Sequence, residues 1–349
     1  MNIKKISTPL AIALLMFPQL IETMYSPALT SIKNHFSVSA ENAAIGTYLA
    51  PNFDLFLYGF GTCAFGAAVG SVCTQTILRD SFEGIELSQL FSIAATSVGI
   101  SPVIGMMIGS WLTSHGGYTW VFAAMIVLIT LLFIWSSAQL PETKPENIKR
   151  DSLLSVANKM IRDSHIWYIT LMIGLANVAL FSYYSIAPFM FEQLGASVKF
   201  FGYTGFVLAI GSVLGSMINM KLIHYKLNGD LIVLIAMILM VISGIGVYLL
   251  QHTIWFFIPM ALVSVAFGLT LPNLFSTALT NYRNHLGSAG ALLGLSYYLI
   301  IGFGLDFAAS IGNLAITLLT CGSCCLVLVC IKHFMTKLAQ SRNAKIATD

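Results

Sequence analysis

Long runs of apolar residues, separated by short polar stretches, repeat along almost the whole chain. A helix that crosses a bilayer needs about 20 mostly apolar residues. We expect ten such helices, at residues 8–29, 53–78, 88–113, 119–139, 166–190, 200–223, 230–250, 254–279, 286–310 and 312–332. The pattern therefore predicts an all-α, polytopic membrane protein with about ten transmembrane helices.

One hydrophilic stretch, beginning "QLPETKPENIKRDS" at Gln139, divides these runs into four before it and six after it. We expect an incomplete N-terminal helical bundle at 1–139, a cytoplasmic linker at 140–165, a six-helix C-terminal bundle at 166–335 and a cytoplasmic tail at 336–349. Transporters built from two similar halves are symmetric. The four-plus-six division is lopsided and indicates a truncated two-bundle architecture.

The composition agrees with a membrane protein. Hydrophobic residues make up 57% of the chain, charged residues make up 9%, and the mean hydropathy is +0.84. A soluble domain carries about 25% charged residues, and a water-soluble fold could not bury this much apolar surface. The lipid bilayer is therefore an expected partner. The first run is expected to be a retained span and not a cleaved signal peptide, because Pro18, Gln19 and Glu22 interrupt it.

Lysine and arginine residues concentrate on one side of the predicted spans. With a cytoplasmic N-terminus, 15 of the 17 fall in cytoplasmic segments, and only Lys33 and Lys199 fall on the opposite side. Loops rich in Lys and Arg stay in the cytoplasm. We therefore expect a multi-pass protein of the cell inner (plasma) membrane with both termini in the cytoplasm.

The first apolar run contains a carboxylate, Glu22, where an ionised group is costly. Its polar residues follow at i, i+3, i+4 and i+7 and share one helical face: Gln19, Glu22, Thr23 and Ser26. Pro18 and Pro27 bracket them and loosen the backbone hydrogen bonds. This pattern is typical of a cavity-lining helix, so these four residues are candidates for binding a proton or a substrate. The alternative is a solvated acid near the external interface.

Three other charged residues are candidates for function. Asp306, in "GFGLDFAAS", lies within a predicted span and could bind a proton or a substrate, or could be an interfacial acid. Arg79 and Asp80 lie at the cytoplasmic end of a predicted helix. A gating or capping role suits them, because a cation near a helix C-terminus stabilises its last carbonyls.

Catalytic and metal-binding patterns are not found in the sequence. "CGSCC" at 321–325 contains a C-x-x-C spacing, but in an apolar helix cysteines of this kind are typical packing residues. The histidines show no clustered spacing, and no nucleophile constellation or phosphate loop is present. We expect no enzyme activity, no metal, no cofactor and no nucleic-acid partner.

Six pieces of the sequence occur in a characteristic order: "ETMYSPAL" (22–29), "GAAVGSVCTQTILRDSF" (66–82), "ISPVIGMMIGSWL" (100–112), "LPET" (140–143), "SYYSIAPFMFEQLG" (182–195) and "GLTLPNLFSTAL" (268–279). In this order they resemble the major facilitator superfamily, and in particular its Bcr/CflA-like drug:proton antiporters. The resemblance implies helices in two bundles and proton-coupled transport of a small-molecule substrate. "ISPVIGMMIGSWL" is similar to the antiporter motif, which makes Pro102, Gly105 and Gly109 candidates for gating. Ordinary helix packing is the alternative.

The chain departs from the family pattern in two places. "ENAAIGTYLAPNFDLFLYG" at 41–59 leads directly into the piece that resembles the fourth family helix, and its apolar part, 43–50, is too short to span a bilayer. This predicts loss of family helices two and three with their loop. Phe60 also stands where the family usually has an arginine that is thought to take part in proton coupling.

Two functions agree with these observations. The first is a secondary transporter that exports drugs or other small molecules by alternating access, with Glu22 carrying the proton. The second is a non-transporting or decayed relative with an internal deletion, at most a membrane-bound binding protein. In a third arrangement, a homodimer would supply the missing walls of the cavity.

Overall fold

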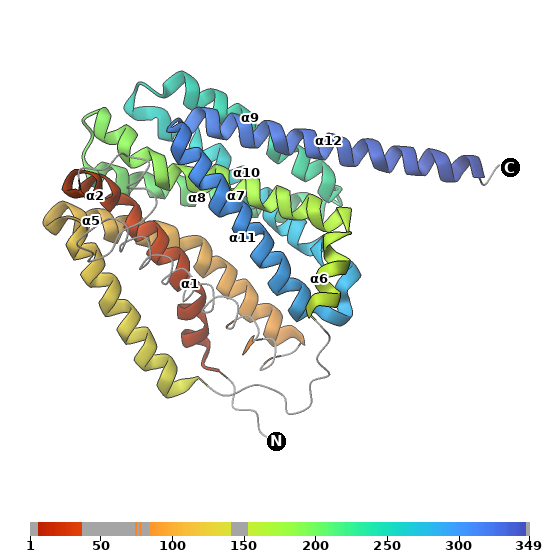
Figure 1. Ribbon diagram of the computed structural model, residues 1–349, viewed down its shortest axis with the longest axis horizontal. Helices are drawn as coiled ribbons and strands as arrows, with labels where there is room; N and C mark the ends of the chain where they lie inside the picture. The colour runs from red at the N-terminus through yellow and green to blue at the C-terminus, as the bar shows by residue number, and fades with distance from the viewer. Residues whose placement is uncertain are drawn as a thin grey trace. The chain divides into compact units, whose positions relative to one another are not determined.

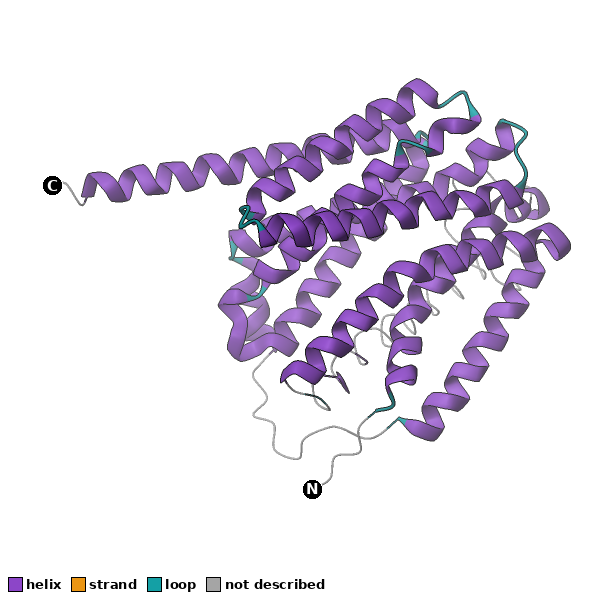
Figure 2. Ribbon diagram, turned by 180° about the vertical axis from the view of Figure 1, so that it is seen from behind, coloured by secondary structure: helices purple, strands orange, loops and turns teal. Residues whose placement is uncertain are grey.

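The computed structural model describes residues 6–36, 74, 77–78, 82, 84–140 and 153–346. The helices are α1 (Thr8–Tyr25), η1 (Ser26–Ala28), α2 (Leu29–Phe36), α5 (Gly84–Gln139), α6 (Leu153–Ile161), α7 (Ser164–Gln193), α8 (Val198–His224), α9 (Gly229–Leu250), η2 (Ile254–Phe257), α10 (Met260–Ala278), η3 (Thr280–His285), α11 (Leu286–Ile311) and α12 (Leu314–Ile346). The described residues contain no strand (Figure 2). The predicted all-helical membrane class is confirmed.

The described part of the chain contains seven helices long and apolar enough to cross a membrane, against the ten predicted for the whole sequence. The predicted spans 88–113 and 119–139 form the single element α5. Most of the predicted span 53–78 lies outside the described residues. α1 does not count among the seven, since Gln19 and Glu22 make its second half more polar.

α5 changes direction at Gly116 and Gly117, whose backbone angles are not helical. Gly117 has a φ of 65°, which only glycine adopts readily. Two arms diverge from this point, drawn in orange and yellow, and α1 lies beside them (Figure 1). The bend falls between the two predicted spans, so the predicted division of this segment is found as a bend within one element.

The chain forms two compact units. The first unit consists of Met1–Asp151 and Tyr184–Ala209, and the second consists of Ser152–Tyr183 and Ile210–Asp349. The end of α7 and the beginning of α8 therefore belong to the first unit, with α1, α2 and α5. This grouping by compactness does not test the predicted domain boundaries, which stay a prediction.

In the first unit, α1 packs along α5 through two glycines. A Cβ atom at Gly105 would lie 2.5 Å from the carbonyl oxygen of Leu20, and one at Gly109 would lie 2.8 Å from the carbonyl carbon of Met24. Small residues allow membrane helices to approach closely. One apolar core of this unit combines residues of α1, η1, α2, α5 and α7: Met24, Tyr25, Ala28, Leu29, Ile32, Val121, Phe122, Met125 and Phe189.

In the second unit, α9 packs against both α10 and α12 (Figure 1). α8 and α10 also meet through glycines, because a Cβ at Gly211 would lie 2.6 Å from the carbonyl oxygen of Ala261. Nearby, Asn273 Nδ2 donates a hydrogen bond of 2.7 Å to Asn219 Oδ1. Small residues and polar bonds are the usual means by which membrane helices associate.

Candidate functional site

The polar face predicted on the first span meets two neighbouring helices. Thr23 is fully buried, and its Oγ1 donates to the carbonyl oxygen of Gln19 at 2.8 Å. A Cβ atom at Gly105 would overlap this hydroxyl, so Thr23 faces α5. Ser26 is also buried, but its Oγ donates to the carbonyl oxygen of Tyr184 on α7.

The bond between Ser26 and Tyr184 follows from a proline. Pro188 lies inside α7 and has no N–H, so the carbonyl four residues earlier, that of Tyr184, loses its helical partner. The Ser26 hydroxyl satisfies this carbonyl instead, which is how serine side chains compensate for proline in membrane helices. The serine predicted as a site residue thus joins η1 to α7.

Glu22 differs from the residues that follow it. It is exposed, whereas residues 23–30 are all buried. Glu22 lies one turn before Ser26, whose hydroxyl bonds to α7, so the two residues share one face of the helix. Gln19, one turn earlier, is partly buried. Glu22 is therefore an accessible acid beside a tightly packed segment.

The polar face continues beyond the predicted stripe. Thr30 and Asn34 follow Ser26 at intervals of four residues, and η1 joins α1 to α2 without an intervening loop. At the far end, Asn34 Nδ2 donates to Glu192 Oε1 at 3.2 Å. Lys33 Nζ lies 2.7 Å from Glu192 Oε2 and 5.7 Å from the centre of the Phe189 ring. The end of α2 is therefore held to the end of α7 by charge and hydrogen bonds.

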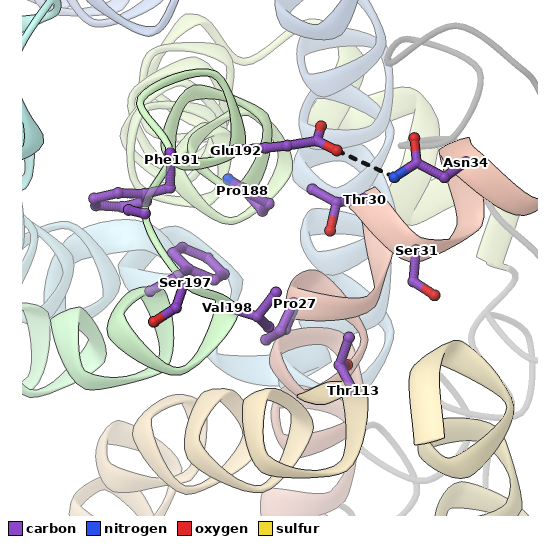
Figure 3. A pocket seen from close by; sticks show the side chains of 13 residues that line it. Pro27, Thr30, Ser31, Asn34, Thr113, Pro188, Phe191, Glu192, Ser197 and Val198 are labelled. Carbon is purple, nitrogen blue, oxygen red and sulfur yellow. Dashed lines mark hydrogen bonds between the residues drawn. The ribbon is translucent and has the colours of Figure 1, made fainter. Parts of the chain in front are cut away.

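A cavity of about 500 Å³ lies at this end of the first unit. Figure 3 shows Glu192 reaching toward Asn34 at its rim, with Thr113 near Pro27 and Val198. The lining residues come from α2, α5, α7 and α8 and from the segments beside them: Pro27, Thr30, Ser31, Asn34, Thr113, Pro188, Phe191, Glu192, Gly195, Ala196, Ser197, Val198 and Phe201.

Sequence reasoning missed the polar members of this cavity. Glu192 lies just beyond the predicted span 166–190, and Thr113 is the last residue of the predicted span 88–113. The spacing of Ser26, Thr30 and Asn34 could have predicted that Thr30 and Asn34 belong to the same polar face, because it extends the predicted stripe by two turns. Nothing in the sequence indicates the pairing of Lys33 with Glu192, since the two residues lie 159 positions apart.

The remaining candidates lie elsewhere. Asp306 is exposed on α11 in the second unit. Pro102 lies within α5, one turn before Gly105. Arg79, Asp80 and Phe60 lie outside the described residues, as does the segment in which loss of two family helices is predicted. The roles proposed for all of these residues stay predictions.

Potential metal ligands do not gather within the described residues, where no group of three His, Cys, Asp or Glu side chains could hold an ion. In the C-x-x-C stretch, Cys321 and Cys325 are buried, and Cys324 is exposed. Buried cysteines spaced by four residues on one helix face are suited to packing.

Comparisons with known proteins agree with the sequence motifs. Residues 36–305 match the family described as Major Facilitator Superfamily. An "Uncharacterized transporter" of Rickettsia bellii is 28% identical over 275 residues, which cover 74% of this chain and 68% of the relative. A "Bicyclomycin resistance protein homolog" of Haemophilus influenzae is 24% identical over 324 residues, which cover 88% of this chain and 77% of the relative.

A solved structure has the same fold. It is a bacterial homolog of the human lysosomal transporter Spinster, crystallised in an inward-facing and unoccupied conformation. The TM-score is 0.59 at 15% sequence identity, and the match covers 94% of this chain and 97% of the other. The similarity to drug-resistance transporters expected from the motifs is confirmed at the level of the family.

Proposed function

Because this chain belongs to the major facilitator superfamily, a family of membrane transporters, we propose that it exports drugs or other small molecules in exchange for protons. The observation that carries the proposal is Glu22. This acid is exposed on a predicted membrane helix whose following residues, 23–30, are all buried. An ionisable group within a span is costly and usually lines a water-filled path.

The proposed mechanism uses the two charge states of Glu22. In its ionised form, the carboxylate is stable only while it faces water or a cation. Protonation removes the charge, so the helices around it can close and reopen on the other side of the membrane. Release of the proton restores the ionised form and resets the cycle. Gln19 lies one turn away and would bind polar groups of the substrate, and Asp306 is a second candidate acid.

A gradient-driven transport assay tests this role of Glu22. The protein would be reconstituted in proteoliposomes with an imposed pH difference of one unit and the membrane potential clamped near zero. Exchange of one proton per uncharged substrate supports an accumulation of about tenfold under these conditions, since 1.4 kcal/mol is a factor of ten. Bicyclomycin is the first probe, because a relative is named for resistance to it.

Matched variants separate coupling from folding. Glu22→Gln keeps the shape of the side chain but cannot ionise, so we expect it to lose accumulation and keep exchange of bicyclomycin across the membrane. Asp230→Asn is the control, because Asp230 pairs with Lys332 at an exposed helix start. Accumulation by Glu22→Gln equal to wild type would refute the role of Glu22. If wild type moves neither bicyclomycin nor other drugs, the non-transporting alternative is favoured.

The proposed function also includes an orientation of the chain in the membrane. We place both termini in the cytoplasm of an inner-membrane protein, with bundles at 1–139 and 166–335, on the distribution of Lys and Arg. Single cysteines introduced at Lys199 and Lys226 are then expected to react with a membrane-impermeant thiol reagent from opposite sides. A homodimer also stays a prediction, which native mass measurement in mild detergent would check.

A further inference from the structure

The cavity at the outer end of the first unit, as the predicted topology places it, has the size of a ligand site. Its volume of about 500 Å³ falls within the range of roughly 300–1,000 Å³ typical of small-molecule pockets. One part of its wall is apolar, formed by Pro27, Pro188, Phe191, Val198 and Phe201. Another part carries hydroxyl, amide and carboxylate groups (Figure 3). A molecule with an apolar body and a few polar groups matches this lining.

Thr113 provides a hydrogen bond that the described protein residues do not use. The residue is 9% exposed, and its Oγ1 has no hydrogen-bond partner among the described residues. Ser110 of the same helix also has a buried hydroxyl without a partner among the described residues, but of these two hydroxyls only that of Thr113 belongs to a residue lining the cavity. Buried polar atoms nearly always have a partner. The unpaired hydroxyl at the cavity wall therefore points to a missing partner there.

The charges beside the cavity cancel. Glu192 accepts one hydrogen bond on each carboxylate oxygen, from Asn34 and from Lys33. A carboxylate has about four acceptor positions, and the Glu192 side chain is 33% exposed, so it can accept from a ligand as well. An anion entering here would meet the carboxylate of Glu192, which lines the cavity. A cation would gain little from that carboxylate, because the ammonium of Lys33, 2.7 Å away, already neutralises it. The ion pair therefore disfavours ligands that carry a net charge.

We propose that this cavity is a second ligand site, separate from Glu22, which binds small uncharged amphipathic molecules that carry hydroxyl or amide groups. A ligand hydroxyl or N–H donates to Glu192. A ligand carbonyl or hydroxyl oxygen accepts from Thr113. The apolar body of the ligand packs against Phe191, Pro188 and Val198. Binding needs neither a proton gradient nor the Glu22 carboxyl, so this site does not depend on the proposed transport mechanism.

Three probes that share one benzyl group test the charge preference. N-acetylphenylalaninol is neutral and carries an amide and a hydroxyl, phenylalaninol is its cationic counterpart at neutral pH, and N-acetylphenylalanine is its anionic counterpart. Binding to the full chain in lipid nanodiscs would be measured by saturation-transfer NMR titration, without a gradient. We expect the neutral probe to bind at least about threefold more tightly than either ion, since like charges close to each other are disfavoured.

Variants of the protein locate the site. Thr113→Val keeps the shape of the side chain and removes the hydroxyl, so we expect it to weaken binding of N-acetylphenylalaninol about fivefold, the worth of one hydrogen bond. Val198→Trp fills the cavity and should abolish binding. Thr130→Val, on the same helix but outside the cavity, should bind as wild type does. Thermal unfolding midpoints verify that each variant is folded.

Three results would overturn the proposal. These are no binding of the neutral probe to wild type, equal binding by wild type and by both cavity variants, or tighter binding of either ion than of N-acetylphenylalaninol. The failure of gradient-driven transport would not affect these measurements. The proposal of a second ligand site and the proposal of proton-coupled transport are therefore tested independently.

Discussion

Replacing Gly109 of α5 by alanine tests whether close contact with α1 holds the first unit together. The new Cβ atom would lie 2.8 Å from the carbonyl carbon and 3.0 Å from the Cα of Met24. Carbon atoms in contact rest about 3.5–4.0 Å apart. The obstructing atoms, the nearest of which is the Met24 carbonyl oxygen, belong to the backbone and cannot rotate away, so α1 would have to move by roughly 1 Å or more. Overpacking of this kind costs about 1–3 kcal/mol.

Thermal unfolding in detergent measures the effect of Gly109→Ala. A loss of 1 kcal/mol lowers the midpoint of a domain of this size by about 2–4 °C, so we expect a fall of several degrees. Gly302→Ala is the matched control, because Gly302 lies within α11 and a Cβ there would meet nothing within 4 Å. Alanine is favoured over glycine in a helix by about 0.8–1.0 kcal/mol, so the control should keep or raise the midpoint. If both variants unfold at the wild-type midpoint or above it, the α1–α5 contact is looser than the structure indicates.

Two further predictions concern hydrogen bonds between helices. Ser26→Ala removes the donor to the Tyr184 carbonyl, and leaving this buried group unpaired should cost about 1–3 kcal/mol. Ser136→Ala, which removes an exposed bond within α5, should change stability by less than about 0.5 kcal/mol, and similar midpoints for the two variants would contradict the proposed link. In the second unit, a double-mutant cycle of Asn219→Ala and Asn273→Ala should give a coupling of about 0.6 kcal/mol, the average for such bonds in membranes. A coupling of zero would show that this bond does not contribute to stability.

The spans were predictable because few backbone conformations are stable in the hydrocarbon core of a bilayer. Apolar segments must satisfy their own N–H and C=O groups, and a helix does so locally. The predicted span 230–250 corresponds to α9 (Gly229–Leu250), and the predicted span 286–310 corresponds to α11 (Leu286–Ile311). Apolar length alone was enough to place these elements within one residue at each end.

Helices outside the apolar runs were missed. α6 lies in the segment predicted as a linker, and α12 continues to Ile346, beyond the predicted span 312–332. Val156 and Met160 of α6 are buried, and α6 packs against α11. Short or polar helices depend on such contacts and on neighbouring residues, and hydropathy over a membrane-length window does not detect them.

The sequence by itself determined the membrane class, most of the spans, the family and the polar face that contains Glu22. These depend on apolar length, residue spacing and local motifs, which are properties of one segment at a time. The tertiary structure decided what that face meets: Thr23 lies against Gly105, Ser26 bonds to the carbonyl freed by Pro188, and Lys33 pairs with Glu192 beside the cavity. Helical periodicity states which side chains point the same way. Which helix packs against that face depends on how segments far apart in the sequence fold together. The spacing of residues within one segment carries no information about that packing.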